Sequence, residues 1–133
     1  MSEAYGILSD HNNPFKEWTL IHMKYCDGTG HQGYRKDPVL YKGSKLWFRG
    51  HNNTIGQLNS IDNLFNIFTQ AKEIIVTGQS AGGLATFLWS NYIVNKASTS
   101  TKIRAVSDSG IFLDQVNYLS KMHNYRSHII NFM

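Results

Sequence analysis

The chain has 133 residues, which is enough for at most one domain. Its composition, 41% hydrophobic and 17% charged, excludes an intrinsically disordered polypeptide. The net charge of +4 comes from 13 basic and 9 acidic residues that we expect to be spread along the chain, so a nucleic-acid-binding module has only the charge in its favour. An acidic polysaccharide is compatible with this charge. We expect no transmembrane segment, and the first residues, Met1–Tyr5, lack the features of a signal peptide.

Periodicity predicts an alternation of strands and helices. Residues 18–25 are mostly apolar and predict a buried strand, after which a glycine-rich loop leads to a short strand or an anchored loop at 46–50. Thr54 is then expected to cap a helix. The helix would present one apolar face, made of Ile55, Leu58, Ile61, Leu64, Phe65 and Phe68.

The second half of the chain repeats this alternation. Residues 74–77 predict a strand, and the helix that follows would present one packing face, made of Leu84, Phe87, Leu88, Asn91 and Tyr92. A polar connection at 95–101 leads to a third strand at 103–107, and residues 115–133 form either a weak helix or an irregular tail. Strands that alternate with helices predict βαβ units and a partial parallel sheet with crossover helices.

One short run carries chemistry. The apolar strand residues before Gly78 lead into Gly-Gln-Ser-Ala-Gly, a G-x-S-x-G pattern, and an apolar helical pattern follows. In this strand–turn–helix context a serine becomes an exposed nucleophile at a strained turn, a nucleophile elbow. Ser80 is therefore the predicted nucleophile, and side chains at Gly78 and Gly82 would collide with their neighbours. The backbone N–H of Ala81 would face the developing oxyanion.

Five blocks together resemble the pectin acetylesterases, a family that includes the Notum-type carboxylesterases. They are Gly6–Ser9, Tyr25–Gly28, Leu46–Gly50, Gly78–Leu84 and Asp108–Asp114, in the family's order and spacing. The resemblance implies an α/β-hydrolase fold, in a single partial domain over residues 1–133. It implies secretion, action on acetylated cell-wall polysaccharide or another ester substrate, and neither a cofactor nor a metal. It also implies that Ser80 is catalytic and that the Ala81 backbone is an oxyanion donor.

The resemblance also implies what lies elsewhere. The family's other oxyanion donors fall upstream of Gly6, and its triad acid and histidine fall downstream of this sequence, so the chain resembles the middle third of such an enzyme. Gln79 departs from the cysteine that is common in plant members. Cys26 matches a family cysteine that is expected to pair, although this chain has no second cysteine.

Other residues are weaker candidates. Asp108 and Asp114 follow the nucleophile, and His123 and His128 follow them, in the order Ser…Asp…His that this fold uses. Because chain order without geometry is weak evidence for a triad, we expect a capping or turn-stabilising role for the aspartates and a surface position for the histidines. His22 suits a packed core, and His11, His31 and His51 show no metal-ligand spacing. Asp27 would line the substrate cleft or stabilise a turn, and we expect Trp47 and Phe48 to pack in the core.

Two hypotheses remain alongside the acetyl-polysaccharide esterase. The chain is a catalytically incomplete fragment or pseudoenzyme, or it belongs to a Notum-type carboxylesterase that removes lipid acyl groups.

Overall fold

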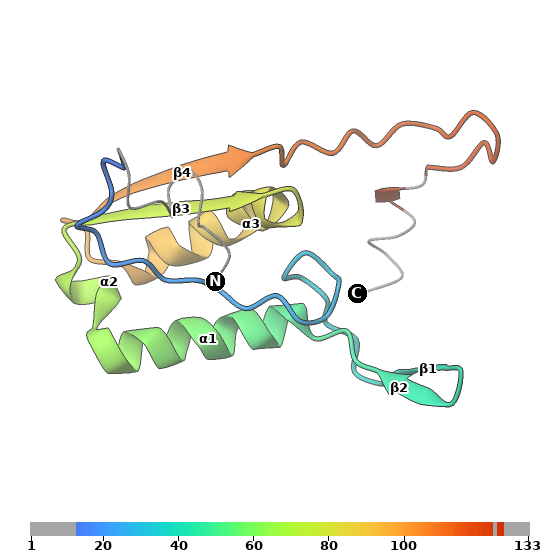
Figure 1. The fold of residues 1–133 in the computed structure, drawn as a ribbon, viewed down its shortest axis with the longest axis horizontal. Coiled ribbons are helices and arrows are strands. Elements are labelled where there is room, and N and C mark those ends of the chain that lie inside the picture. Colours follow the sequence, from blue (N-terminus) through green and yellow to red (C-terminus); the bar gives the residue numbers. More distant parts are fainter. Residues whose placement is uncertain (1–12, 124, 127–133) are drawn as a thin grey trace.

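A computed structural model describes residues 13–123 and 125–126. Figure 1 shows a small sheet with a helix packed against it, another long helix below, and a hairpin that stands away from this body. In chain order the elements are β1 (Val39–Tyr41), β2 (Ser44–Leu46), α1 (Gly50–Phe65), α2 (Ile67–Gln70), β3 (Glu73–Gln79), α3 (Ala81–Lys96) and β4 (Lys102–Asp108).

The centre of the fold is a parallel βαβ unit. β3 and β4 pair in parallel, from Glu73 opposite Lys102 to Gln79 opposite Asp108, and α3 connects them and packs on both. The predictions of strands at 74–77 and 103–107 and of a parallel crossover are confirmed, and both strands are longer than predicted. The fold class is therefore mixed α/β.

The predicted strand at 18–25 is absent. The segment pairs with no strand in the described part of the chain, and the sheet of β3 and β4 has two strands rather than three. The backbone of Lys24 is instead satisfied by a side chain, because its N–H donates to Gln57 Oε1 at 2.7 Å and its carbonyl accepts from Gln57 Nε2 at 3.2 Å. An apolar run identifies a strand only when a neighbouring strand supplies the ladder, and none lies beside this run.

Helix α1 begins four residues before the predicted cap. Thr54 is buried inside the helix, and the position before Gly50 has no side-chain cap. The carboxylate of Asp27 accepts the Gly50 N–H from another segment, which performs the capping function and which no local sequence pattern reveals. The helix ends at Phe65, where Asn66 takes a left-handed conformation, so Phe68 belongs to α2.

The core lies where α1, α2 and α3 meet. It consists of Leu58, Phe68, Ala85, Trp89 and Ile93. The predicted packing face of α3 is wrong in part, since Phe87 and Leu88 are 56% and 50% exposed. Helix α3 is apolar on more than one side, and its small residues decide which side faces the strands, because they allow the closest approach.

The chain beyond β4 runs away from the sheet (Figure 1). As far as His123 it is irregular, and it contains one isolated bridge between Val116 and His123. No helix among the described residues is long and apolar enough to cross a membrane.

Candidate active site

Ser80 occupies the single residue between the end of β3 and the start of α3. Its backbone has φ 54° and ψ −115°. For a residue other than glycine this conformation costs about 1–3 kcal/mol, and such strain concentrates at functional sites. The Ser80 N–H donates to the Asp108 carbonyl at 2.9 Å, and its own carbonyl accepts from the Leu84 N–H at 3.0 Å. The turn is thus fixed to the end of β4 on one side and to α3 on the other.

The hydroxyl of Ser80 takes no part in holding this turn. A serine at the start of a helix commonly accepts a hydrogen bond from the second or third amide of that helix. Ser80 makes no such capping bond, and its side chain is exposed. The strained backbone therefore presents a hydroxyl that the helix does not use.

The glycines around Ser80 have unequal roles. A Cβ at Gly78 would lie 2.5 Å from the carbonyl carbon and oxygen of Gly82, and one at Gly83 would lie 2.7 Å from the Asp108 carbonyl oxygen. A Cβ at Gly82 would meet nothing within 4 Å, so the collision predicted there is wrong. Glycine is required where β3 passes the first turn of α3 and where α3 touches the end of β4.

Ala81 is the first residue of α3, so its N–H has no acceptor within the helix. Gly30 lies beside it, because a Cβ at Gly30 would be 3.8 Å from the Ala81 carbonyl oxygen and 3.7 Å from Leu84 Cδ2. Residues 27–33 therefore form one wall next to the Ser80 turn. The oxyanion role of the Ala81 N–H stays a prediction.

Asp27 organises this wall. Its carboxylate accepts hydrogen bonds from the Thr29 N–H at 3.2 Å, from the Thr29 hydroxyl at 2.8 Å and from the Gly50 N–H. The Thr29 hydroxyl oxygen in turn accepts the Gly33 N–H at 2.7 Å. Asp27 thus acts on the backbone, as the turn-stabilising alternative predicts, and it ties the wall to the start of α1.

His31 also belongs to this wall, although no metal-ligand spacing in the sequence points to it. Its ring stacks on Tyr25 with centroids 4.8 Å apart, and its carbonyl accepts from Trp89 Nε1 at 3.0 Å. Burial lowers the pKa of His31 below its ordinary value, Asp27 partly opposes this effect, and His22 adds to it. Its backbone φ of 66° is a tertiary feature that a histidine in a loop sequence does not signal.

The lowered pKa of His31 predicts a pH effect on stability. Because the unfolded chain binds this proton more readily, the free energy of unfolding falls as the pH drops below about 6.5 and levels off below the folded-state pKa. We expect His31→Gln to reduce this loss between pH 8 and pH 5, as measured by urea unfolding at each pH. An equal loss in the wild type and the variant would contradict the assignment.

The sequence-predicted acids and bases are not brought to Ser80 by any hydrogen bond within the described residues. Asp108 contacts the turn through its backbone, while its carboxylate accepts from the Ser109 hydroxyl at 2.9 Å. Asp114 is engaged elsewhere, with His123 Nδ1 and Arg126 Nε each 3.2 Å from its Oδ2. His128 and His11 lie outside the described residues.

The remaining aromatic predictions have mixed outcomes. His22 was expected to pack in the core and is exposed, and so is Trp47. His51 packs its ring on Trp89, with centroids 5.1 Å apart.

Comparison with known proteins identifies the family. The model of the Pectinacetylesterase family matches residues 2–132. The chain belongs to this family. It is 32% identical over 132 residues to pectin acetylesterase 5 of Arabidopsis thaliana, and the matched region covers 95% of this chain and 30% of that relative. It is 29% identical over 118 residues to pectin acetylesterase 4 of the same plant, and this match covers 86% of the chain and 28% of the relative. The chain thus spans less than a third of the length of these relatives, and no solved structure matches it.

Cys26 of this pectinacetylesterase family member is exposed and free. It immediately precedes Asp27, on the approach to the wall beside Ser80. The disulfide to a cysteine elsewhere, which the family resemblance implies, stays a prediction.

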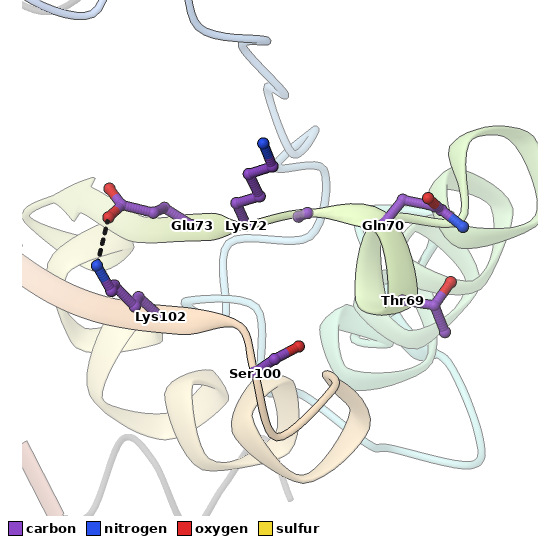
Figure 2. Close-up of a pocket in the computed structure, with 7 residues that line it drawn as sticks. Thr69, Gln70, Lys72, Glu73, Ser100 and Lys102 are labelled. Carbon is purple, nitrogen blue, oxygen red and sulfur yellow. Dashed lines mark ion pairs between the residues drawn. The ribbon is translucent and has the colours of Figure 1, made fainter.

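A cavity of about 450 Å³ lies at the opposite end of the sheet. Figure 2 shows Glu73 and Lys102 directed toward each other at its rim, with Nζ and Oε1 3.7 Å apart. Its lining consists of Thr69, Gln70, Ala71, Lys72, Glu73, Ser100 and Lys102. β3 separates this cavity from Ser80 by about 20 Å at the usual rise per strand residue, so its side chains do not reach the Ser80 hydroxyl.

Proposed function

We propose that this chain carries the nucleophile of a serine carboxylic-ester hydrolase that removes acetyl groups from polysaccharide, in an α/β-hydrolase fold with a nucleophile elbow at Ser80. The observation that carries the proposal is the strained, uncapped Ser80 between a parallel strand and a helix. The names of the relatives, pectin acetylesterases, supply the reaction and the substrate class.

The reaction follows from the position of Ser80. A general base accepts the hydroxyl proton while Oγ attacks the acetyl carbonyl, and the oxyanion that forms accepts a hydrogen bond from the Ala81 N–H. The base then gives the proton to the departing sugar oxygen, which leaves an acetyl-serine. Water repeats the sequence, acetate is released and the hydroxyl is restored.

The base and the acid are the parts that the described residues do not supply to Ser80. We place both in a part of the protein outside the given sequence, as the family resemblance implies. We also propose, on the same resemblance, that the protein is secreted. The second candidate is a catalytically incomplete unit. It is favoured by one observation, that within the described residues no histidine is hydrogen-bonded to the Ser80 hydroxyl.

Covalent labelling tests the proposal. We expect a fluorophosphonate probe to label the full-length protein, and peptide mapping to place the adduct on Ser80, because a serine activated by a base attacks phosphorus while an ordinary serine does not. The matched control is Ser60→Ala. In the wild type the exposed Ser60 hydroxyl donates to the Gly56 carbonyl of its own helix at 2.8 Å, so this variant should label as fully as the wild type. Absence of labelling in the full-length protein would favour the incomplete unit.

A series of chromogenic esters, from acetate to octanoate, separates the two acyl classes. Preference for acetate supports the polysaccharide esterase, whereas preference for octanoate would favour a lipid-acyl carboxylesterase.

A further inference from the structure

Residues 34–49, which are the β1–β2 hairpin with its two flanking segments and are called the hairpin below, carry the whole net charge of the chain. Residues 34–49 contain five basic residues and one acidic residue, a net charge of +4, while the rest of the chain has eight of each sign. The expectation that the basic residues are spread along the chain is therefore wrong. Figure 1 shows β1 and β2 standing away from the body, beyond the start of α1, where the wall of residues 27–33 also lies.

Three lysines of the hairpin form no ion pair with a carboxylate among the described residues. None of the ion pairs in the described part of the chain involves Lys36, Lys42 or Lys45, and all three side chains are exposed. Arg49 contacts the carbonyl of Lys36 at 2.8 Å and lies over the Trp47 ring, 4.4 Å from its centroid. A local charge excess on a projecting element attracts a polyanion.

Aromatic side chains accompany these cations. Tyr34, Tyr41 and Trp47 are 60%, 55% and 48% exposed, and the Lys42 ammonium lies 5.3 Å from the centroid of the Tyr41 ring. Flat apolar rings with polar edges pack against the C–H faces of sugars, while the ammonium groups suit carboxylates.

The tip of the hairpin adds an independent observation. Lys42 and Gly43 form its two-residue turn, and both have positive φ, 46° and 78°. A turn of this type favours asparagine at the first position, and a lysine there adopts a backbone conformation that is unfavourable for its side chain. The turn thus keeps a cation at its most projecting point at a cost in local stability.

The base of the hairpin is joined to the wall of residues 27–33. The Arg35 N–H donates to the Phe48 carbonyl at 2.9 Å, and the His51 N–H donates to the Gly33 carbonyl at 3.0 Å. Gly33 belongs to the same wall as Gly30, which lies against Ala81. A polymer that follows the hairpin is therefore led to the wall beside Ala81, the residue that follows Ser80.

We propose that the β1–β2 hairpin is a binding arm for an anionic polysaccharide, a polyuronate, with its cations on the carboxylates and its aromatic rings on the sugar faces. The proposal rests on the proposed function for the choice of polymer. Binding is predominantly electrostatic and weakens as the ionic strength rises.

The test measures binding of polygalacturonate to the full-length protein that carries Ser80→Ala, by isothermal titration at low and physiological salt. Adding Lys42→Asn and Lys45→Gln removes two cations, and asparagine suits the turn better than lysine does, so lost binding does not reflect an unfolded hairpin. We expect at least a tenfold loss of affinity. The control pair, Lys72→Gln with Lys96→Gln, removes the same charge from exposed positions on the body and should cost less than twofold.

Competing polymers identify the ligand class. A fully methyl-esterified polygalacturonate should bind at least tenfold more weakly, whereas equal binding would overturn the role of the carboxylates. Tighter binding of single-stranded DNA or of anionic phospholipid vesicles than of polygalacturonate would overturn the polysaccharide assignment. Equal affinities of the hairpin pair and the control pair would overturn the location.

Hydrolysis of a small chromogenic acetate ester keeps this proposal distinct from the proposed function. With Ser80 intact, the hairpin variants should hydrolyse it at the wild-type rate, because so small a substrate does not reach the arm. If hydrolysis does not depend on Ser80, the proposed function fails while the binding result still decides the arm.

Discussion

Ser80→Ala is expected to lower kcat for acetate esters by roughly 10⁵- to 10⁶-fold in the full-length protein, the loss typical of removing a triad serine. Without Oγ no acetyl-enzyme forms, and the remaining rate comes from substrate binding and oxyanion stabilisation alone. Initial rates on a chromogenic acetate, with active-site titration of the wild type, measure the effect. The Ser60→Ala variant should keep full activity.

Two variants of Ser80 separate the contribution of the hydroxyl to activity from the effect of the strained backbone on stability. Alanine at φ 54° is as strained as serine, so Ser80→Ala should unfold at the wild-type temperature. Glycine accepts this conformation, so Ser80→Gly should be equally inactive and about 1 kcal/mol more stable. If Ser80→Gly is instead less stable than Ser80→Ala, the backbone strain assigned to this turn is wrong.

Gly78→Ala is expected to destabilise the protein by about 3 kcal/mol, the upper part of the range for overpacked sites. The new methyl group would lie 2.5 Å from the backbone of Gly82, and neither β3 nor the first turn of α3 can move without breaking the parallel ladder or the Ser80 turn. Urea or thermal unfolding of the full-length protein measures the loss.

Gly82→Ala is the matched control for this substitution. It adds the same methyl group one turn away, where nothing lies within 4 Å. It should leave stability unchanged or raise it by up to about 1 kcal/mol, because alanine has a higher helix propensity than glycine. Equal destabilisation by the two substitutions would contradict the close approach at Gly78.

Some features of the site are predictable from the sequence, and others are not. The strand before Ser80, the helix after it and the parallel return through residues 103–107 were all predicted, because their signals are local: an apolar β-branched run, a glycine-flanked serine and an apolar helical pattern. The wall of residues 27–33 was left open between turn and cleft, because it is set by contacts between segments distant in the chain. Asp27 binds the Gly50 N–H across 23 positions, and Trp89 reaches the His31 carbonyl across 58.

By itself the sequence determined the strand–turn–helix context of Ser80 and the family, and it predicted Ser80 as the nucleophile, since each depends on residue types at short spacing. Only the tertiary structure decided which glycines near Ser80 are indispensable, where α1 begins, which side of α3 is buried and that the net charge projects on a hairpin. Residues 18–25 form no strand because no neighbouring strand pairs with them. Gly82 tolerates a side chain while Gly78 does not, because only Gly78 faces backbone across the turn. Pairing partners and approach distances are properties of segments brought together by folding, and a local pattern does not contain them.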